Sequence, residues 1–167
     1  MFTTRTATAD DAALITAHRR KMFEAMRAPN SAANSATGPQ DQLLDQMSRT
    51  FEPWVRELIG AGKYIGWVAE ENGRVAGSAG LLILDWPPHP LDPTTGRRAY
   101  LLNIFVEPEF RKRGLAHSLI ERGIAEARQR HIRVVTLHSS DAGRRVYEKF
   151  GFHPTSEMLY AAPETDG

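Results

Sequence analysis

The stretch that decides the fold reads Asn103-Ile104-Phe105-Val106-Glu107-Pro108-Glu109-Phe110-Arg111-Lys112-Arg113-Gly114-Leu115-Ala116. It predicts an apolar strand that passes through a basic glycine turn into a helix. Gly114 lets the backbone approach an anion closely, and the free amides and dipole of a helix start attract negative charge. Arg111, Lys112 and Arg113 add three positive charges. The stretch therefore predicts a phosphate or pyrophosphate site, with a simple solvated turn as the alternative.

The spacing of this turn has a known counterpart. Arg111-x-x-Gly114-x-Ala116, directly after a strand and Pro108, resembles the acyl-coenzyme A signature of the GNAT superfamily of N-acyltransferases. The chain lacks the three spaced glycines of a dinucleotide fingerprint and the Gly-Lys-Ser/Thr of a Walker loop at this place. The resemblance therefore favours coenzyme A over a dinucleotide or a nucleoside triphosphate.

A second segment, residues 137–152, is also similar to GNAT proteins. The family commonly carries a Leu-Tyr-Glu-Lys-x-Gly-Phe run here, and its tyrosine falls on Tyr147. Two residues depart from the common pattern: Ser140 stands where many members carry Asn, and Gly143 where many carry Ala. The match is dense over residues 100–158 and loose through the first half of the chain.

The resemblance implies an α/β (α+β) fold with a mixed, mostly antiparallel sheet of about six to seven strands and helices on both faces. The fourth and fifth strands would be parallel and splayed, and the pantetheine arm of acetyl-coenzyme A, the cosubstrate, would lie in that opening. Coenzyme A would be the product. The residues expected to bind the cofactor are Ile104, Phe105, Val106, Arg111, Lys112, Arg113, Gly114, Leu115, Ala116, Ser140, Gly143 and Tyr147.

Local patterns predict the elements in chain order. Asp10 is expected to cap the first helix, Asn72-Gly73 to turn a hairpin, Ser140 or Asp141 to cap the last helix and Gly151 to end it. The expected strands are residues 2–8, 64–70, 75–84, 98–106, 132–137 and 157–161. The expected helices follow Asp10, run through residues 43–60 and 114–130, and follow Ser140, while residues 30–39 are expected to form a mobile loop.

Length, composition and charge limit the number of domains and the kinds of partner that the chain can have. A chain of 167 residues with 41% hydrophobic content predicts one domain, residues 1–167. The net charge of +1 argues against nucleic acid as a partner, and no apolar stretch approaches the roughly 18 residues of a membrane span. With no apolar signal core at the amino terminus, we expect a cytoplasmic protein without a membrane partner. No metal site is expected, and a homodimer is left open.

The absence of cysteine excludes an acyl-cysteine intermediate. The resemblance therefore implies that an amine attacks the thioester directly in a ternary complex. Tyr147 is the expected acid that protonates the leaving thiolate, and a purely packing role is the alternative. For the general base we favour His138, with Asp85 and Glu107 as rivals.

The acceptor pocket is expected to involve Met22, Phe23, Trp86, His89 and Asn103, which suggest an apolar slot with few charged anchors. Asn103 occupies a strand on which many family members carry an acidic residue. The sequence thus predicts an N-acetyltransferase that moves an acetyl group from acetyl-coenzyme A to a primary amine of a small molecule. A protein or peptide N-acetyltransferase and a non-catalytic acyl-coenzyme A sensor are the alternatives.

Overall fold

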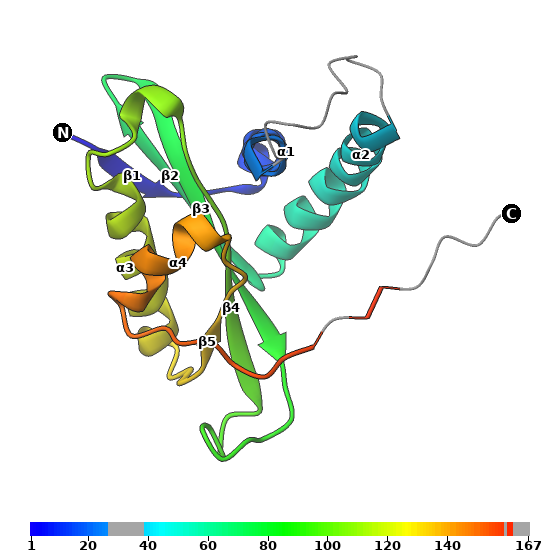
Figure 1. Ribbon diagram of the computed structural model, residues 1–167, viewed down its shortest axis with the longest axis vertical. Helices are drawn as coiled ribbons and strands as arrows, with labels where there is room; N and C mark the ends of the chain where they lie inside the picture. Colours follow the sequence, from blue (N-terminus) through cyan, green and yellow to red (C-terminus); the bar gives the residue numbers. More distant parts are fainter. Residues whose placement is uncertain (27–38, 159, 162–167) are drawn as a thin grey trace, which may run out of the picture.

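The computed structural model describes residues 1–26, 39–158 and 160–161, which form a twisted sheet with helices packed on it (Figure 1). Within these residues the sheet has five strands, paired in chain order. The first four are antiparallel neighbours, and the fifth pairs parallel with the fourth. The strands are β1 (Thr3–Thr6), β2 (Tyr64–Glu71), β3 (Arg74–Asp85), β4 (Arg97–Val106) and β5 (Val135–Thr136).

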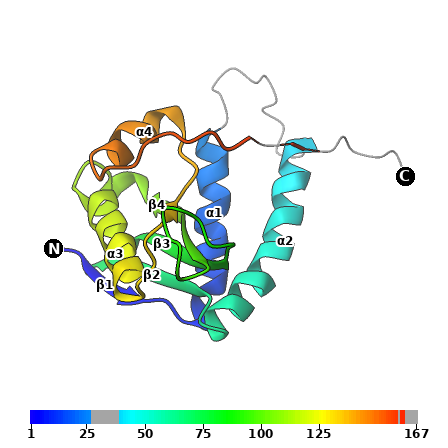
Figure 2. The ribbon, with the colours of Figure 1, turned by 90° about the horizontal axis from the view of Figure 1, so that it is seen from below.

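Helices cover both faces of the sheet, as Figure 2 shows. On one side lie α1 (Ala12–Met26) and α2 (Pro39–Gly60), and on the other lie α3 (Leu115–Gln129) and α4 (Asp141–Glu148). Two short 3-10 turns, η1 (Ala9–Asp11) and η2 (Pro108–Phe110), precede α1 and α3. No helix in the described ranges has the length and apolar character needed to cross a membrane.

Each face of the sheet has its own apolar core, because successive strand residues point to opposite sides. Tyr64 and Val68 of β2 pack with α1 and α2, whereas Ile65 and Trp67 of the same strand pack with α3. This double coverage explains why residues 64–69 are all buried. The expected hairpin is confirmed, and its turn residues Asn72 and Gly73 have the predicted positive φ angles of 52° and 73°.

A β-bulge interrupts β4. Gly80 of β3 pairs with Leu102 and Ser78 pairs with Phe105, so β4 advances three residues where β3 advances two. As a result Leu102 and Asn103 both face α1 and α2, although neighbouring strand residues normally alternate. Asn103 adopts the left-handed conformation with φ 55°. The bulge therefore turns the Asn103 side chain to the face opposite α3.

The mixed sheet with parallel fourth and fifth strands is confirmed, but the expected number of strands is wrong. The sheet has five strands in the described residues, and the described part of 157–161 is not a strand. Met158 and Tyr160 are 97% and 86% exposed, so their apolar side chains find no core to bury against. The fifth strand is also shorter than expected, because β5 leaves β4 after Thr136.

The ends of α3 and α4 agree with the sequence, whereas the cap of the first helix and the start of α2 differ from it. The cap lies at Thr8 rather than Asp10, because Asp11 turns back to accept a hydrogen bond from the Thr8 amide at 2.8 Å while Arg5 holds its carboxylate. Ser140 caps α4 by accepting a hydrogen bond from the Gly143 amide, and Gly151 follows with φ 87°. Most of the expected loop at 30–39 lies outside the described residues, and Pro39 already begins α2.

Candidate functional site

The site begins where β4 and β5 separate. The two strands pair only at Ala99 with Val135 and at Tyr100 with Thr136. Beyond Tyr100, residues 101–106 of β4 have no partner on the β5 side among the described residues. An unpaired strand edge exposes backbone donors and acceptors that an extended ligand can bind. Ile104, Phe105 and Val106, which the sequence predicts to bind the pantetheine arm, lie in this free segment.

The start of α3 follows directly, and it is open. Gly114 occupies the N-cap position with φ 82°, no side chain caps the helix, and its first turn contains no acidic residue. An added Cβ at Gly114 would meet no atom within 4 Å, so the space in front of the helix is free. The first amides of α3, including those of Leu115 and Ala116, have no carbonyl partner within the helix. An uncapped helix start with free space fits a pyrophosphate group.

The three cations of this turn have different roles. Arg113 forms two hydrogen bonds to Glu71, at 2.7 and 2.8 Å, and its guanidinium lies 4.7 Å from the ring centre of Phe2. Arg113, with a smaller contribution from the terminal ammonium, lowers the pKa of the Glu71 carboxyl to about 2. Arg111 donates from Nε to the Val106 carbonyl at 3.0 Å, and Lys112 is exposed. Arg113 thus anchors the loop to β2, while Arg111 ties the loop to the free end of β4.

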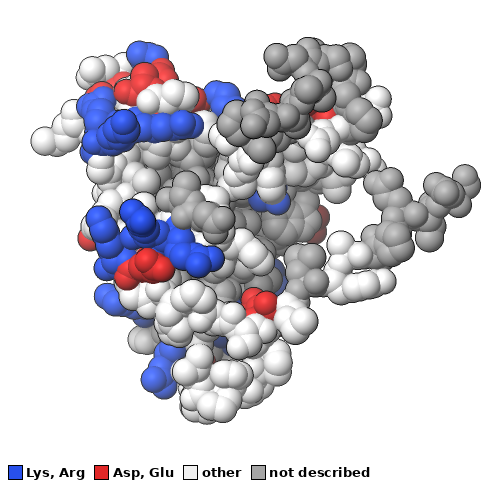
Figure 3. Space-filling model, in the orientation of Figure 1, with Lys and Arg blue, Asp and Glu red and all other residues white. Residues whose placement is uncertain are grey.

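Positive charge on this side of the molecule is concentrated in two places. Figure 3 shows Lys and Arg side chains gathered over the start of α3 and, separately, over α4. The α4 group contains the exposed residues Arg144, Arg145 and Lys149. Two basic groups on either side of the β4–β5 opening favour a ligand that carries several phosphates.

Tyr147 lies on the α3 side of the sheet. Its ring packs against the α3 core and meets Phe152 edge to face, with ring centres 6.0 Å apart. Burial raises the pKa of its phenol, so the hydroxyl is protonated at neutral pH. No hydrogen bond to another described residue occupies that hydroxyl. Together with Leu137, Tyr147 lines a cavity of about 880 Å³ between α3, β5 and α4.

His138 lies on the opposite side of the chain that leaves β5. Its Nδ1 forms a hydrogen bond with the hydroxyl of Tyr100, the last residue of β4 that pairs with β5. His138 is exposed and does not line the cavity beside Tyr147. His138 and Tyr147, the two predicted catalytic residues, therefore have different surroundings, and their catalytic roles stay predictions. Sequence reasoning missed Tyr100, although its place immediately before the free segment of β4 could have pointed to it.

The rival bases are engaged elsewhere. Glu107 accepts a hydrogen bond from Lys21 Nζ at 2.5 Å and lies 3.4 Å from Nε2 of the buried His18. Burial lowers the pKa of His18, whose Nδ1 is paired with Ser78 Oγ at 2.8 Å. Asp85 is exposed beside Lys63 at the end of β3, away from the start of α3. Both acids are thus engaged with cationic or basic partners, and their role as rival bases stays a prediction.

On the α1–α2 side, the structure brings Phe23 and Asn103 together through Arg19. Arg19 donates from Nη1 to Asn103 Oδ1 at 2.7 Å, and its guanidinium lies 4.9 Å from the ring centre of Phe23. Asn103 also donates to the Tyr64 hydroxyl at 3.0 Å. Gly80 makes room for that hydroxyl, since an added Cβ would lie 2.0 Å from it. Sequence reasoning missed Arg19, whose i, i+4 spacing to Phe23 was the available signal.

The remaining predicted acceptor residues lie apart from this group. Met22 is half-buried on α1. Trp86 belongs to the β3–β4 loop and stacks with the Arg98 guanidinium, 3.9 Å from the ring centre. His89 accepts a hydrogen bond from the Leu91 amide in the same loop. Among the described residues, no hydrogen bond or ring contact joins Trp86 or His89 to Asn103. They stay predictions as substrate-binding residues.

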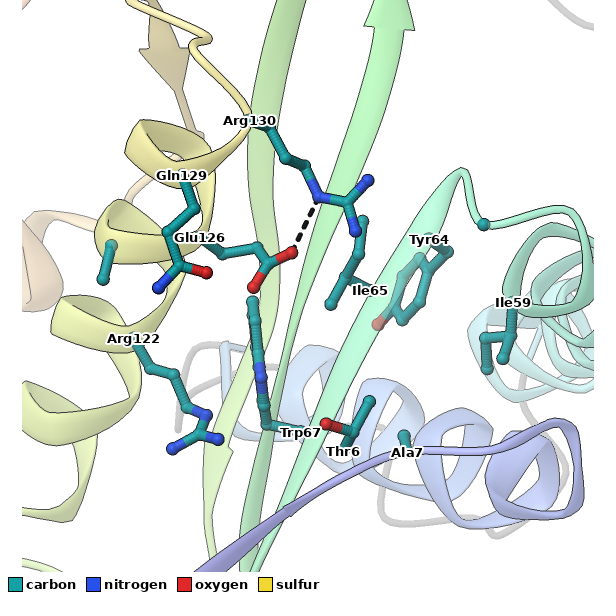
Figure 4. A pocket seen from close by; sticks show the side chains of 12 residues that line it. Thr6, Ala7, Ile59, Tyr64, Ile65, Trp67, Arg122, Glu126, Gln129 and Arg130 are labelled. Atoms are coloured by element: carbon teal, nitrogen blue, oxygen red, sulfur yellow. Dashed lines mark hydrogen bonds and ion pairs between the residues drawn. The ribbon is translucent and has the colours of Figure 1, made fainter.

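A further cavity, of about 460 Å³, lies between β2 and the carboxyl-terminal half of α3. Figure 4 shows the ion pair of Glu126 with Arg130, at 2.7 Å, close to Trp67, with Tyr64 farther to the right. None of the predicted site residues lines it, and neither β4 nor β5 contributes to it. This cavity is therefore separate from the opening described above.

Comparison with known proteins is consistent with this arrangement. The family model of the acetyltransferase (GNAT) family matches residues 22–152. A relative from Escherichia coli K12, the [ribosomal protein bS18]-alanine N-acetyltransferase, is 27% identical over 135 residues, which cover 77% of this chain and 83% of that protein. Human N-acetyltransferase 8 is 30% identical over 98 residues, which cover 56% of this chain and 40% of that protein.

Solved structures share the whole fold. A GCN5-related N-acetyltransferase from Ralstonia eutropha JMP134 superposes with a TM-score of 0.85 and 34% identity, covering 97% of this chain and 99% of that one. A predicted acetyltransferase from Clostridium acetobutylicum, solved with acetyl-CoA, has a TM-score of 0.79 and 28% identity, covering 97% and 96%. The chain therefore belongs to the acetyltransferase (GNAT) family and is an acetyltransferase that takes its acetyl group from acetyl-coenzyme A.

Proposed function

We propose that the chain transfers the acetyl group directly to a primary amine of a small molecule, in a ternary complex. The observation that carries this proposal is the opening beside residues 101–106, which meets the uncapped start of α3. Phosphates would lie on the amides from Arg113 to Ala116, and the extended arm along Ile104 to Val106. Acetyl-coenzyme A supplies an activated acyl carbon, and the chain supplies the groups on either side of it.

The two faces of the opening support different proton transfers. As the amine nitrogen bonds to the acyl carbon and the carbon–sulfur bond breaks, Tyr147 donates its proton to the departing sulfur. His138 takes the proton that the amine nitrogen loses, provided that its Nδ1–H donates to Tyr100 and leaves Nε2 as the acceptor. Solvent restores both side chains, so no proton is gained or lost overall. No covalent acetyl-enzyme is needed.

A small acceptor is favoured by the cleft between α1 and α2, an open and mostly apolar space of about 520 Å³ beside Leu102. A protein amino terminus is the second candidate. It is supported by the identity to the Escherichia coli protein that is named for acting on an alanine of a ribosomal protein. A protein substrate would need a groove long enough for an extended chain, whereas a volume of about 520 Å³ is that of a small-molecule site.

Release of free coenzyme A thiol, measured over a panel of small amines and of peptides with free amino termini, tests the proposal. We expect at least one small amine to exceed every peptide in kcat/KM by about tenfold or more, a difference of about 1.4 kcal/mol in transition-state binding. Mass spectrometry of the product should find one acetyl group on nitrogen. Preference for peptides would favour the second candidate, and binding without any release would indicate a sensor.

A further inference from the structure

Arg19 is the one charged residue in the described lining of a mostly apolar cleft, whose polar members are Gln46 and Thr50. It projects from α1 into the space between α1 and α2, whose other walls include Leu43, Met47, Phe51, Trp54 and Leu102. The guanidinium lies between two aromatic rings, 4.9 Å from the centre of Phe23 and 4.8 Å from that of Phe51. The rings hold the charged group at the base of the cleft, next to the β4 bulge where Asn103 accepts its hydrogen bond.

The described residues offer this charge no counter-charge. No carboxylate in the described part of the chain lies within ion-pair distance of Arg19, and its Nε is buried without a hydrogen-bond partner. The next residue, Arg20, differs completely, because it is paired with both Glu24 and Asp45. Burial lowers the pKa of Arg19, because it disfavours the charged form of the guanidinium. A desolvated, unpaired cation is costly for the folded protein alone, and an anionic ligand would remove that cost.

We propose, building on the function proposed above, that Arg19 binds the carboxylate of the acceptor and that the acceptor is an α-amino acid with an apolar side chain. The planar guanidinium matches a carboxylate in two parallel hydrogen bonds, and the apolar wall of the cleft accepts the side chain. Because one carbon separates the amine from the carboxylate, an amino acid held at Arg19 presents its amine beside Asn103 and the free segment of β4.

The same placement separates an amino acid from a peptide. In the first residue of a peptide the carboxylate is replaced by an amide, which carries no charge to pair with Arg19. Hydrogen bonds link Arg19 to Asn103 and Asn103 to the Tyr64 hydroxyl, and Tyr100 lies near enough to Arg19 to interact with its charge. Tyr100 in turn forms a hydrogen bond with His138, the proposed base. The alternative is that Arg19 only orients Asn103.

The test compares L-leucine, L-methionine and L-phenylalanine with their carboxamides as acceptors, in the wild type, Arg19→Met and Arg20→Met. The amine of a carboxamide is less basic than that of the acid and is more often in the neutral, nucleophilic form. Without a role for Arg19, the carboxamides should therefore be the better acceptors. We expect the wild type to prefer the acids in kcat/KM by about tenfold or more, as for one charge-assisted hydrogen bond. Arg19→Met should abolish this preference, mainly through KM for the acids. Arg20→Met, a loss of arginine from the same helix, should retain it.

The outcomes separate this inference from the proposed function. Equal use of acids and carboxamides by the wild type, or an equal loss of activity with both in Arg19→Met, would show that Arg19 does not bind the acceptor carboxylate. The proposal of amine acetylation would be unaffected. If no amine is acetylated, the proposed function is wrong. Calorimetric titration of the coenzyme A-loaded protein with L-leucine then tests whether Arg19 binds a carboxylate. Binding that Arg19→Met abolishes supports it, and absence of binding to the wild type contradicts it. Unchanged coenzyme A affinity and thermal midpoint in Arg19→Met exclude misfolding as the cause.

Discussion

Tyr147 is the residue at which catalysis and packing are hardest to tell apart, because its ring contributes to the α3 core while its hydroxyl has no partner among the described residues. Tyr147→Phe removes one oxygen atom and keeps the ring. If the phenol protonates the leaving thiolate, kcat should fall by about 100-fold or more with little change in acetyl-coenzyme A affinity. A packing role predicts instead a stability loss of about 1 kcal/mol or less and near-normal turnover.

The pH profile gives the same prediction a second readout. Burial raises the pKa of Tyr147, so the proton is present throughout the neutral range, and its loss should reduce kcat only above the ordinary tyrosine pKa of about 10. Tyr160→Phe is the matched control, because Tyr160 is 86% exposed. Turnover of Tyr147→Phe within threefold of the wild type would remove the general-acid assignment.

The side-chain positions of Asn103 and Arg19 could not be predicted from the sequence. Asn103 stands in an apolar strand, and strict alternation would turn it toward α3, but the bulge turns it toward α1. Arg19 occurs in a run of three basic residues on a helix, which normally indicates a solvated face. Its partner lies 84 positions away in the chain. Contacts of that range depend on the packed fold and have no local signature.

Among the elements, the start of α3 carries the clearest prediction. Gly114→Val places a branched side chain in the open space before the uncapped amides, where the phosphates would lie. We expect the dissociation constant for coenzyme A to rise by at least tenfold, about 1.4 kcal/mol, in a calorimetric titration.

A valine at positive φ is strained wherever it occurs, so the control must share that strain. Gly62→Val does, because Gly62 has φ 68° and equally open surroundings but lies in the turn before β2. The control should lose stability without losing coenzyme A affinity. Equal affinities for the two variants would show that the start of α3 does not hold the phosphates.

The elements also show how far sequence reasoning reaches. The hairpin at Asn72-Gly73, the glycine after α4 and the strand–turn–helix around Gly114 depend on local chemistry, and all three were predicted. The strand expected at 157–161 is not found in the described residues, and β5 is shorter than expected, because strand pairing requires a distant partner at the right place in the sheet. The family resemblance located the β4–β5 opening, whereas periodicity alone gave only two strands joined by a helix.

In the whole molecule, the sheet separates the features proposed to bind the cofactor from those proposed to bind the acceptor. The α3–α4 side carries the open helix start, both basic groups and Tyr147, and the α1–α2 side carries the apolar cleft with Arg19. The opening between β4 and β5 is where the two sides meet. A cofactor and an acceptor that bind from different sides can be present together, which is the condition for direct transfer.

Initial-rate kinetics with both substrates varied test this central claim most directly. A chain without cysteine, with separate faces for donor and acceptor, should form a ternary complex. Double-reciprocal plots against acetyl-coenzyme A at several fixed amine concentrations should therefore give intersecting lines, and the enzyme incubated with acetyl-coenzyme A alone should carry no transferable acetyl group. Parallel lines, together with an acetylated enzyme that passes its acetyl group to the amine, would contradict direct transfer.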